Sequence, residues 1–215
     1  MSQILTDISE NLQKGKAKIV KALVEQALEE GIPAADILQK GMMPGMDVIA
    51  EKFQKNEVFV PEVLIAARAM NMGTQVLKPY LDSASTVIGK AVVGTVKGDL
   101  HDIGKNLVRM MLEGKGIEVI DLGVDVSPEQ YLAAFKENDA DVIALSALLT
   151  TTMGEMKNTV QAFVDAGIRD QAIIMVGGAP VTDHFRDECG ADIYTADAAS
   201  AAEAAKQAIL AKKAA

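Results

Sequence analysis

Residues 91–104 read AVVGTVKGDLHDIG, and this stretch decides the fold of the C-terminal half of the chain. Its first six residues, Ala91–Val96, form a continuous apolar run of the kind found in buried strands. A glycine-containing polar loop follows, and an apolar helical pattern then begins near Ile103. A buried strand that leads directly into a helix is the opening unit of an α/β fold, so we expect a strand, a loop and a helix here.

The same alternation continues toward the C-terminus. Further apolar runs of strand length occur at 117–120, 142–145, 172–176 and 192–194. Helical patterns separate them, at 103–114, 128–136, 154–166 and in an alanine-rich C-terminal segment. Strands that are apolar along their whole length are typical of a parallel sheet covered by helices on both faces. The sequence therefore predicts an α/β Rossmann-like (flavodoxin-like) domain with a parallel five-stranded sheet in residues 85–215.

The N-terminal part has a different pattern, in which apolar residues recur at three- and four-residue steps. The run 19–28 shows this spacing, and Pro61 fits the first turn of a long helix. Neither is interrupted by a strand-like alternation. We expect an all-α helical bundle in residues 1–84, and the polar stretch LDSAST at 81–86 is predicted to be a linker and a candidate hinge.

Charge and composition restrict the classes of partner. The chain has 215 residues, of which 30 are acidic and 21 basic, giving a formal net charge of −9. Such a surface repels phosphate backbones and anionic lipid, so no nucleic acid and no membrane are expected as partners. The single cysteine excludes an internal disulfide, and the sequence shows neither a signal peptide nor an apolar stretch long enough to span a bilayer. We therefore expect a cytoplasmic protein.

The loop after the first predicted strand holds the strongest candidate for a ligand site. Ligands of open parallel sheets bind beyond the carboxyl ends of the strands, which is where residues 97–104 lie. This loop contains His101, one of two histidines in the chain, and Asp99 two residues before it. An imidazole can bind cobalt or a related metal, and a carboxylate on its other nitrogen fixes its tautomer. The alternative is a structural loop histidine followed by a helix-capping Asp102.

Three elements at fixed spacing connect this loop to a known family. Asp99-x-His101-x-x-Gly104 is followed after 41 residues by Ser146-Ala147-Leu148, and after 28 more by Gly177-Gly178. Together these elements resemble the cobalamin-binding domain of methionine synthase and of the small corrinoid proteins of methyltransferase systems. The helical half is also similar to those corrinoid proteins, in Gly41-Met-x-x-Gly45-Met46 and in Pro61-Glu62. The resemblance thus covers nearly the whole chain.

The resemblance implies roles for the residues of these motifs. His101 is expected to be the metal ligand, below the cobalt of a bound cobalamin (methylcobalamin or a related corrinoid), with Asp99 bonded to its other ring nitrogen. The hydroxyl of Thr152, where methionine synthase has a serine, is expected within reach of Asp99, and these three residues form the expected catalytic group. The residues expected to bind the cofactor are Gly98, Asp99, His101, Asp102, Ile103, Gly104, Ser146, Leu148, Thr150, Thr152, Gly177, Gly178, Ala179, Tyr194, Ala196 and Asp197.

The same resemblance implies how the rest of the cofactor is held. Its dimethylbenzimidazole base is expected to leave the cobalt and enter the sheet domain as a tail. Ser146 and Leu148 are expected to line this slot, Gly177 and Gly178 to leave room for it, and residues 194–198 to close it. The helical bundle is expected to cap the upper face of the corrin with a polarizable surface, supplied by Met42, Met43, Met46, Met70 and Met72.

The function implied by the resemblance is that of a methyl carrier, a non-catalytic subunit of a cobalamin-dependent methyltransferase system. A substrate:corrinoid methyltransferase is expected to supply the methyl group from a methylamine, betaine, aromatic ether or methanol. A methylcorrinoid:acceptor methyltransferase is expected to pass it to tetrahydrofolate or a thiol coenzyme. A reductive activation protein is a further expected partner.

Three alternatives stay open at this point. The cobalamin-binding subunit of an adenosylcobalamin-dependent mutase shares the Asp-x-His-x-x-Gly loop. A cobalamin sensor that regulates transcription is opposed by the net charge of −9, because DNA binding needs a basic surface. A plain metal site built from His101 and His184 is opposed by the lack of a Cys pair or a His-x-x-x-His spacing.

Overall fold

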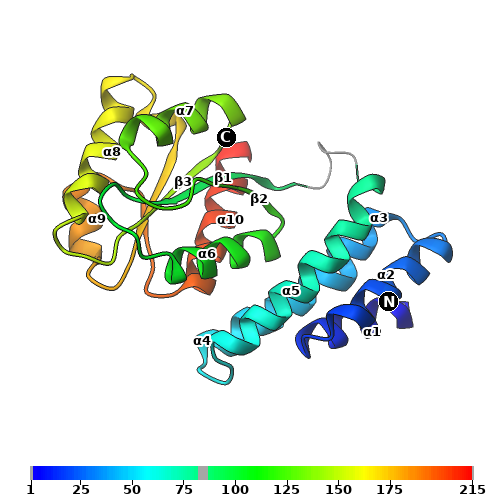
Figure 1. Ribbon diagram of the computed structural model, residues 1–215. Helices are drawn as coiled ribbons and strands as arrows, with labels where there is room; N and C mark the ends of the chain where they lie inside the picture. Colours follow the sequence, from blue (N-terminus) through cyan, green and yellow to red (C-terminus); the bar gives the residue numbers. More distant parts are fainter. Residues whose placement is uncertain (1, 82–86, 215) are drawn as a thin grey trace. The chain divides into compact units, whose positions relative to one another are not determined.

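The computed structural model describes residues 2–81 and 87–214, which form two compact units (Figure 1). The helical unit comprises the chain up to Val87 together with Gly114–Gly116, and the sheet unit comprises the rest. The domain boundary and the hinge that the sequence predicts at 81–86 fall almost entirely on residues 82–86, which lie outside the described residues. Both stay predictions.

The helical unit is built from amphipathic helices around an aliphatic core. Helix α5 has Pro61 in its first turn, and the Glu62 carboxylate accepts the Phe59 N–H at 3.0 Å. Helix α2 packs along α5, and both bury small and branched apolar side chains between them. The elements are α1 (Gln3–Gln13), α2 (Ala17–Glu29), α3 (Ala34–Asp36), the π-helical segment η1 (Ile37–Met42), α4 (Met43–Gln54), α5 (Val60–Leu77) and the 3₁₀ turn η2 (Lys78–Tyr80).

One detail of this unit differs from the sequence prediction. The pattern predicts two separate helices near 33–38 and 46–53, whereas the structure joins them through the π-helical segment η1. Pro44 is the second residue after η1 and has no N–H to donate to the residue 40 carbonyl, so an α-helical bond is missing there and a wider π-type turn takes its place.

The sheet unit is a five-stranded parallel sheet with the strand order β2-β1-β3-β4-β5, which confirms the flavodoxin-like prediction. The strands are β1 (Gly89–Thr95), β2 (Ile117–Asp121), β3 (Val142–Ser146), β4 (Ile173–Gly177) and β5 (Ile193–Tyr194). The helices are α6 (Ile103–Gly114), α7 (Pro128–Asn138), α8 (Met153–Asp165), α9 (Asp183–Cys189) and α10 (Ala198–Ala214), with a short 3₁₀ turn η3 (Arg169–Gln171) before β4. Each predicted strand lies within two or three residues of an observed one.

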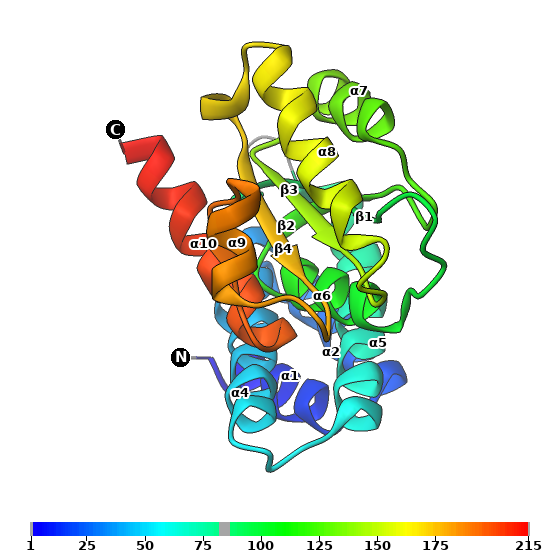
Figure 2. The same ribbon diagram turned by 90° about the vertical axis from the view of Figure 1, so that its left-hand side faces the viewer.

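Helices cover both faces of this sheet. Helices α7, α8 and α9 pack on one face, and α6 and α10 lie on the other (Figures 1 and 2). The α7–α9 face has the larger aromatic core, with Phe135 and Phe163 in edge-to-face contact at 5.2 Å. On the same face Tyr131 lies directly over Gly94, where a Cβ would come within 2.5 Å of its hydroxyl oxygen. Gly94 is therefore required by the packing of α7 on β1.

The strand order also places the ligand site. Strands β1 and β3 are neighbours, and the chain leaves them toward opposite edges of the sheet. The loops after these two strands therefore emerge side by side at a topological switch point. They contain Asp99 and His101 on one side and Ser146–Thr152 on the other.

Within the part of the chain that the structure describes, no helix is both long enough and apolar enough to cross a membrane.

Candidate functional site

A glycine conformation and a threonine hydrogen bond fix the loop after β1, which carries His101. Gly98 takes a positive φ of 78°, which an L side chain rarely adopts. The buried Thr95 hydroxyl at the end of β1 donates to the His101 carbonyl oxygen at 2.9 Å. The loop thus turns back on the strand end, and His101 is held next to it.

The carboxylate of Asp99 is the centre of the site, and its side chain is completely buried. Its Oδ1 accepts the Nδ1–H of His101 at 2.7 Å and the His101 backbone N–H at 3.1 Å. Its Oδ2 accepts the N–H groups of Leu148 and Leu149 at 2.8 and 3.2 Å, and Oγ1 of Thr152 lies at 2.8 Å. One carboxylate therefore joins the loops after β1 and β3.

The electrostatics of Asp99 determine the state of the histidine. Burial alone raises the pKa of this carboxyl, but the hydrogen bonds from His101, Leu148 and Thr152 outweigh it and hold the pKa well below its usual range. An ionised carboxylate can only accept, so Nδ1 of His101 carries the hydrogen. The imidazole is half-exposed, at 50%, and its Nε2 has no hydrogen-bond partner among the described residues. Nε2 therefore presents a lone pair that a metal can take.

Thr152 completes the polar group as the sequence predicts. Its Oγ1 also lies 2.9 Å from the Leu149 carbonyl oxygen, so its single proton can go to either acceptor. The methyl group that distinguishes it from serine points toward Gly98, where a Cβ would lie 3.7 Å away. The extra methyl is thus accommodated without moving the hydroxyl from Asp99.

The two segments that meet at Asp99 expose several large apolar side chains. Leu100 and Ile103 flank His101 in the sequence and are 71% and 79% exposed, and Leu148 and Leu149 from the neighbouring loop are also exposed. Large exposed apolar side chains in one region indicate a binding surface. A half-exposed metal-binding nitrogen on segments that expose such side chains fits a broad ligand that brings its own metal, such as a corrinoid.

Beneath this surface, small side chains form a row across three strands. Thr95, Ser146 and Gly177 are direct register neighbours at the ends of β1, β3 and β4. Because their strand neighbours Val96, Leu145 and Val176 belong to the core under α7–α9, this row faces α6 and α10. A Cβ at Gly177 would meet nothing within 4 Å, so space is open there. The residues present therefore fit a narrow group that enters along this row.

Gly178 has a different reason to be glycine from the one the sequence suggests. Its φ is 134°, and a Cβ there would overlap the backbone carbonyl of Ala147. The absence of a side chain thus lets the loop after β4 pack against the loop after β3. Of the Gly-Gly pair, Gly177 has the open space beside it.

The other predicted residues are distributed along the same edge, with two exceptions. The ring of Tyr194 packs against the core under α7–α9, the opposite face from Ser146 and Gly177. The Asp197 carboxylate caps α10, accepting the Ala199 and Ser200 N–H groups at 2.9 Å each. The structure brings neither side chain to the row of small residues. The remaining predicted positions are exposed at the same edge, Ile103 and Gly104 in the first turn of α6 and the others in loops: Asp102, Thr150, Ala179 and Ala196.

Asp102 occupies the position before α6, but its carboxylate binds the Asn106 side chain at 2.9 Å and no backbone N–H in the first turn. The anchor of that helix is instead Lys105, which is nearly fully buried and lies 2.6 Å from Asp121 at the end of β2. A buried lysine needs such a partner. Sequence reasoning missed Lys105 and also Asp125, whose carboxylate accepts the Gly98 N–H, because their partners are 16 and 27 residues away. It also missed Thr95, whose hydroxyl meets the His101 carbonyl only because the loop turns back on the strand end.

A metal held by several protein side chains is not seen. Among residues 2–81 and 87–214, no group of three or more His, Cys, Asp or Glu side chains is placed to hold a metal ion. His184 is exposed on α9. His101 offers one nitrogen.

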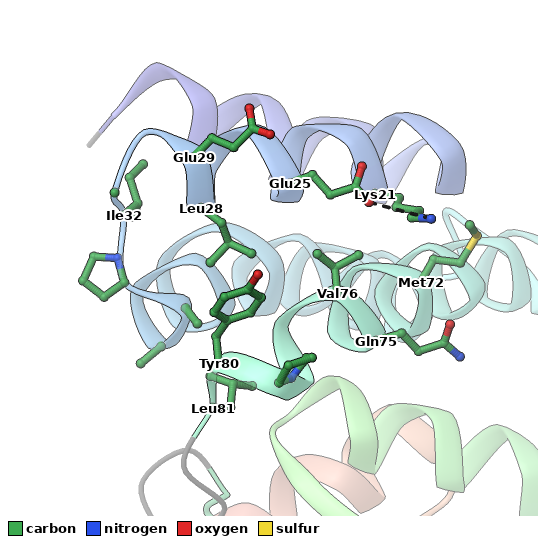
Figure 3. A pocket seen from close by; sticks show the side chains of 15 residues that line it. Lys21, Glu25, Leu28, Glu29, Ile32, Met72, Gln75, Val76, Tyr80 and Leu81 are labelled. Atoms are coloured by element: carbon green, nitrogen blue, oxygen red, sulfur yellow. Dashed lines mark ion pairs between the residues drawn. The ribbon is translucent and has the colours of Figure 1, made fainter.

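The helical unit shows two surface features of its own. A pocket of about 1150 Å³ lies between the C-terminal parts of α2 and α5, with Leu28, Val76 and Tyr80 around it and the Lys21–Glu25 ion pair at its rim (Figure 3). None of the predicted site residues lines it.

The methionines predicted to form a cap surface are mostly core. Met42, Met46 and Met70 are buried, and Met43 and Met72 are half-buried. The large apolar side chains that the α2 and α5 region exposes are Ile19, Phe59, Leu64 and Ile65.

Comparison with known proteins follows the division into two units. A family profile described as a B12 binding domain matches residues 89–206, and a second profile of the same description matches residues 4–78. Trimethylamine corrinoid protein 1 of Methanosarcina acetivorans is 41% identical over 193 residues, covering 88% of this chain and 86% of that protein. Dimethylamine corrinoid protein 2 of the same organism is 38% identical over 212 residues, covering 98% of each.

Solved structures show the same likeness. The methanol:cobalamin methyltransferase complex of Methanosarcina barkeri contains a chain with a TM-score of 0.88 and 29% identity, matched over 97% of this chain and 80% of that one. A cobalamin-binding protein from Desulfitobacterium hafniense matches with a TM-score of 0.79 and 30% identity, over 95% and 98% of the two chains.

Proposed function

We propose, from the premise that this chain belongs to the B12-binding family of corrinoid proteins, that it carries a methyl group between two methyltransferases. The observation that carries the proposal is the Asp99–His101 pair, with its buried carboxylate at 2.7 Å from Nδ1 and its free, half-exposed Nε2. A bound corrinoid supplies the cobalt chemistry of methyl transfer. The relatives favour this function over the adenosylcobalamin-dependent mutase alternative.

The residues of the site have separable tasks in this proposal. Nε2 of His101 is the metal ligand, and Asp99 fixes the tautomer and ring orientation by holding the Nδ1–H. Thr152 Oγ1 lies 2.8 Å from the other carboxylate oxygen of Asp99 and helps to hold the carboxylate in place. Ligation through Nε2 would thus depend on an imidazole whose orientation Asp99 sets.

The row of small residues is the proposed slot for the nucleotide tail of the corrinoid. Thr95, Ser146 and Gly177 lead from beneath His101 across the sheet, and the space beside Gly177 is open. Leu148, exposed at the edge, adds an apolar side chain to this lining. A side chain placed at Gly177 is expected to block the slot.

The helical unit is proposed to shield the reactive face of the corrin. The exposed apolar side chains of Phe59, Leu64 and Ile65 at the start of α5 support this role, because they can exclude water from a ligand. The buried methionines do not contribute to such a surface.

The finer identity of the partners is also a proposal. The trimethylamine and dimethylamine corrinoid proteins are the relatives of highest identity described above, so we propose a methylamine as the methyl donor and its corrinoid methyltransferase as the loading partner. A methylcorrinoid:acceptor methyltransferase and a reductive activation protein complete the proposed set. A cytoplasmic location is proposed with them.

The chain contains a matched pair for testing the ligand assignment, because it has only two histidines. The purified protein is loaded with cobalamin under reducing, oxygen-free conditions and examined as cobalt(II) by electron spin resonance. The wild type and His184→Ala are expected to show the splitting from an imidazole nitrogen, and His101→Ala is expected to bind corrinoid without that splitting. Unchanged splitting in His101→Ala, or no corrinoid retained by the wild type, would contradict the proposal.

A further inference from the structure

The loop after β2 reaches across to the loop that carries His101, and Asp125 makes the contact. We propose that Asp125 is a positioning residue for His101: it holds the backbone at Gly98 and Asp99 so that the Asp99 carboxylate meets the imidazole. The consequence for metal ligation rests on the proposed function, whereas the consequence for the loop does not.

Two hydrogen bonds join Asp125 to consecutive residues of the His101 loop. Its carboxylate Oδ1 accepts the Gly98 N–H at 2.7 Å, and its own N–H donates to the Asp99 carbonyl oxygen at 3.1 Å. The two peptide units that flank the Gly98–Asp99 peptide are thus both held, the preceding one at the Gly98 N–H and the following one at the Asp99 carbonyl oxygen. This fixes the direction in which the Asp99 side chain leaves the backbone.

Backbone hydrogen bonds continue beyond the ends of β1 and β2 and place Asp125 beside the His101 loop. The Thr95 N–H donates to the Gly123 carbonyl oxygen at 2.9 Å, and the Val126 N–H donates to the Thr95 carbonyl oxygen at 3.0 Å. Val96 and Val126 form an isolated parallel bridge. The residues on both sides of Asp125 are therefore tied to the end of β1, which holds the backbone of Asp125 beside Gly98.

The backbone of Asp125 supports the same conclusion. Its φ is 56°, in the left-handed region that non-glycine residues adopt at a cost unless their surroundings impose it. Asp139 shares this conformation with a φ of 50°, but there the reason is an ordinary helix end, since Asp139 is the C-cap of α7. Asp125 caps no helix, and what its conformation achieves is the pair of bonds to Gly98 and Asp99.

The contact with Asp125 fixes the direction of the Asp99 side chain, whereas other hydrogen bonds keep its carboxyl group ionised. Its carboxylate is anchored by Leu148, Leu149 and Thr152 on the Oδ2 side. Those bonds leave Oδ1 for His101 only while the backbone at Gly98 and Asp99 keeps its place. Loss of the Asp125 carboxylate is therefore expected to loosen the Asp99–His101 bond without touching the histidine itself.

The experiment compares Asp125→Gly with Asp125→Asn. Glycine accepts the positive φ but has no carboxylate, whereas asparagine keeps an acceptor oxygen and tolerates the left-handed region. Asp139→Gly is the matched control, because it replaces another left-handed aspartate away from the site. In the apoprotein, hydrogen exchange of the Gly98 amide and the tautomer of His101 are read by NMR, with His184 as an internal reference.

Asp125→Gly is expected to speed exchange of the Gly98 amide at least tenfold and to mix the His101 tautomers. In the cobalamin-loaded protein, it is expected to weaken the nitrogen splitting and to lower corrinoid affinity by about tenfold, the lower end for outer partners of a metal ligand. Asp125→Asn and Asp139→Gly are expected to resemble the wild type in all readouts.

Two results overturn the inference. One is an unchanged Gly98 exchange rate and His101 tautomer in Asp125→Gly. The other is an Asp125→Asn protein as impaired as Asp125→Gly, because the hydrogen bond would then not be the cause. If the wild type retains no corrinoid, the proposed function fails, but the apoprotein readouts still decide the role of Asp125.

Discussion

The two units of this chain bury different kinds of side chain. The helical unit is closed by aliphatic side chains such as Ile8, Leu12 and Ile49, and among its described residues no polar or charged residue is buried. The sheet unit buries Thr95, Asp99, Lys105, Thr152 and Thr159, and the first four lie at or next to the carboxyl edge of the sheet.

Burying a polar group costs free energy unless the group forms hydrogen bonds inside the protein. Asp99 meets this condition through five hydrogen-bond contacts from four residues, and Lys105 through Asp121 and Asn106. The helical unit is therefore stabilised by apolar packing, whereas the edge of the sheet is held by a buried polar network around one histidine nitrogen that makes no hydrogen bond in the described residues. Three variants test whether the two units differ in this way.

The largest effect is expected from Asp99→Ala. It leaves the N–H groups of Leu148 and Leu149 and the Thr152 hydroxyl without their acceptor and frees His101. We expect the free energy of unfolding to fall by about 3–5 kcal/mol and the nitrogen splitting at cobalt(II) to disappear. Urea unfolding and electron spin resonance measure the two effects. A loss of less than about 1 kcal/mol would show that the network is not the stabilising element of this edge.

A cavity-creating substitution in the helical unit is expected to lower the free energy of unfolding almost as much as Asp99→Ala does. It is not expected to change the ligation by His101. Ile8→Ala empties a position that is fully buried in α1, and we expect a loss of about 2–4 kcal/mol. Corrinoid bound to the protein should keep its imidazole splitting, because no bond of His101 changes. Ile19→Ala, at an exposed position of α2, serves as the control and should cost about 0.5 kcal/mol or less. Loss of the splitting in Ile8→Ala would remove the distinction between the units.

The smallest expected effect is on the stability of the protein at acidic pH. The pKa of Asp99 is lowered in the folded protein, while in the unfolded chain it is near the ordinary value of about 3.9. The stability that comes from this difference is fully present above about pH 5 and is lost as the pH falls through 3.9 toward the lowered folded pKa. Asp99→Asn lacks this titration. Its urea midpoint should therefore fall less steeply than that of the wild type between about pH 5 and 3. Parallel slopes would mean that Asp99 does not contribute to the acid sensitivity.

The sequence predicted most of the architecture because its signals are local. Apolar runs of strand length and three- to four-residue helical steps determined where strands and helices lie, within a few residues. The predictions were less accurate where one residue changes a helix without ending it, as Pro44 does after η1. They were also incomplete for methionine, because the spacing of Met42, Met46 and Met70 suits a core and a surface equally well, and the structure places all three in the core.

The order of residues is enough to show that Asp99 and His101 share a loop at the carboxyl end of a buried strand, two residues apart. The chemistry of that pair depends on contacts that exist only in the folded chain. The groups that hold the other carboxylate oxygen, Leu148 and Thr152, are 49 and 53 residues away, and Asp125 is 27 residues from Gly98. Hydrogen bonds over such distances depend on strand order and register, which place β3 and β2 on either side of β1. Local sequence patterns do not show which strands pair or in which register. The charge of Asp99 and the tautomer and orientation of His101 therefore follow only from the folded chain.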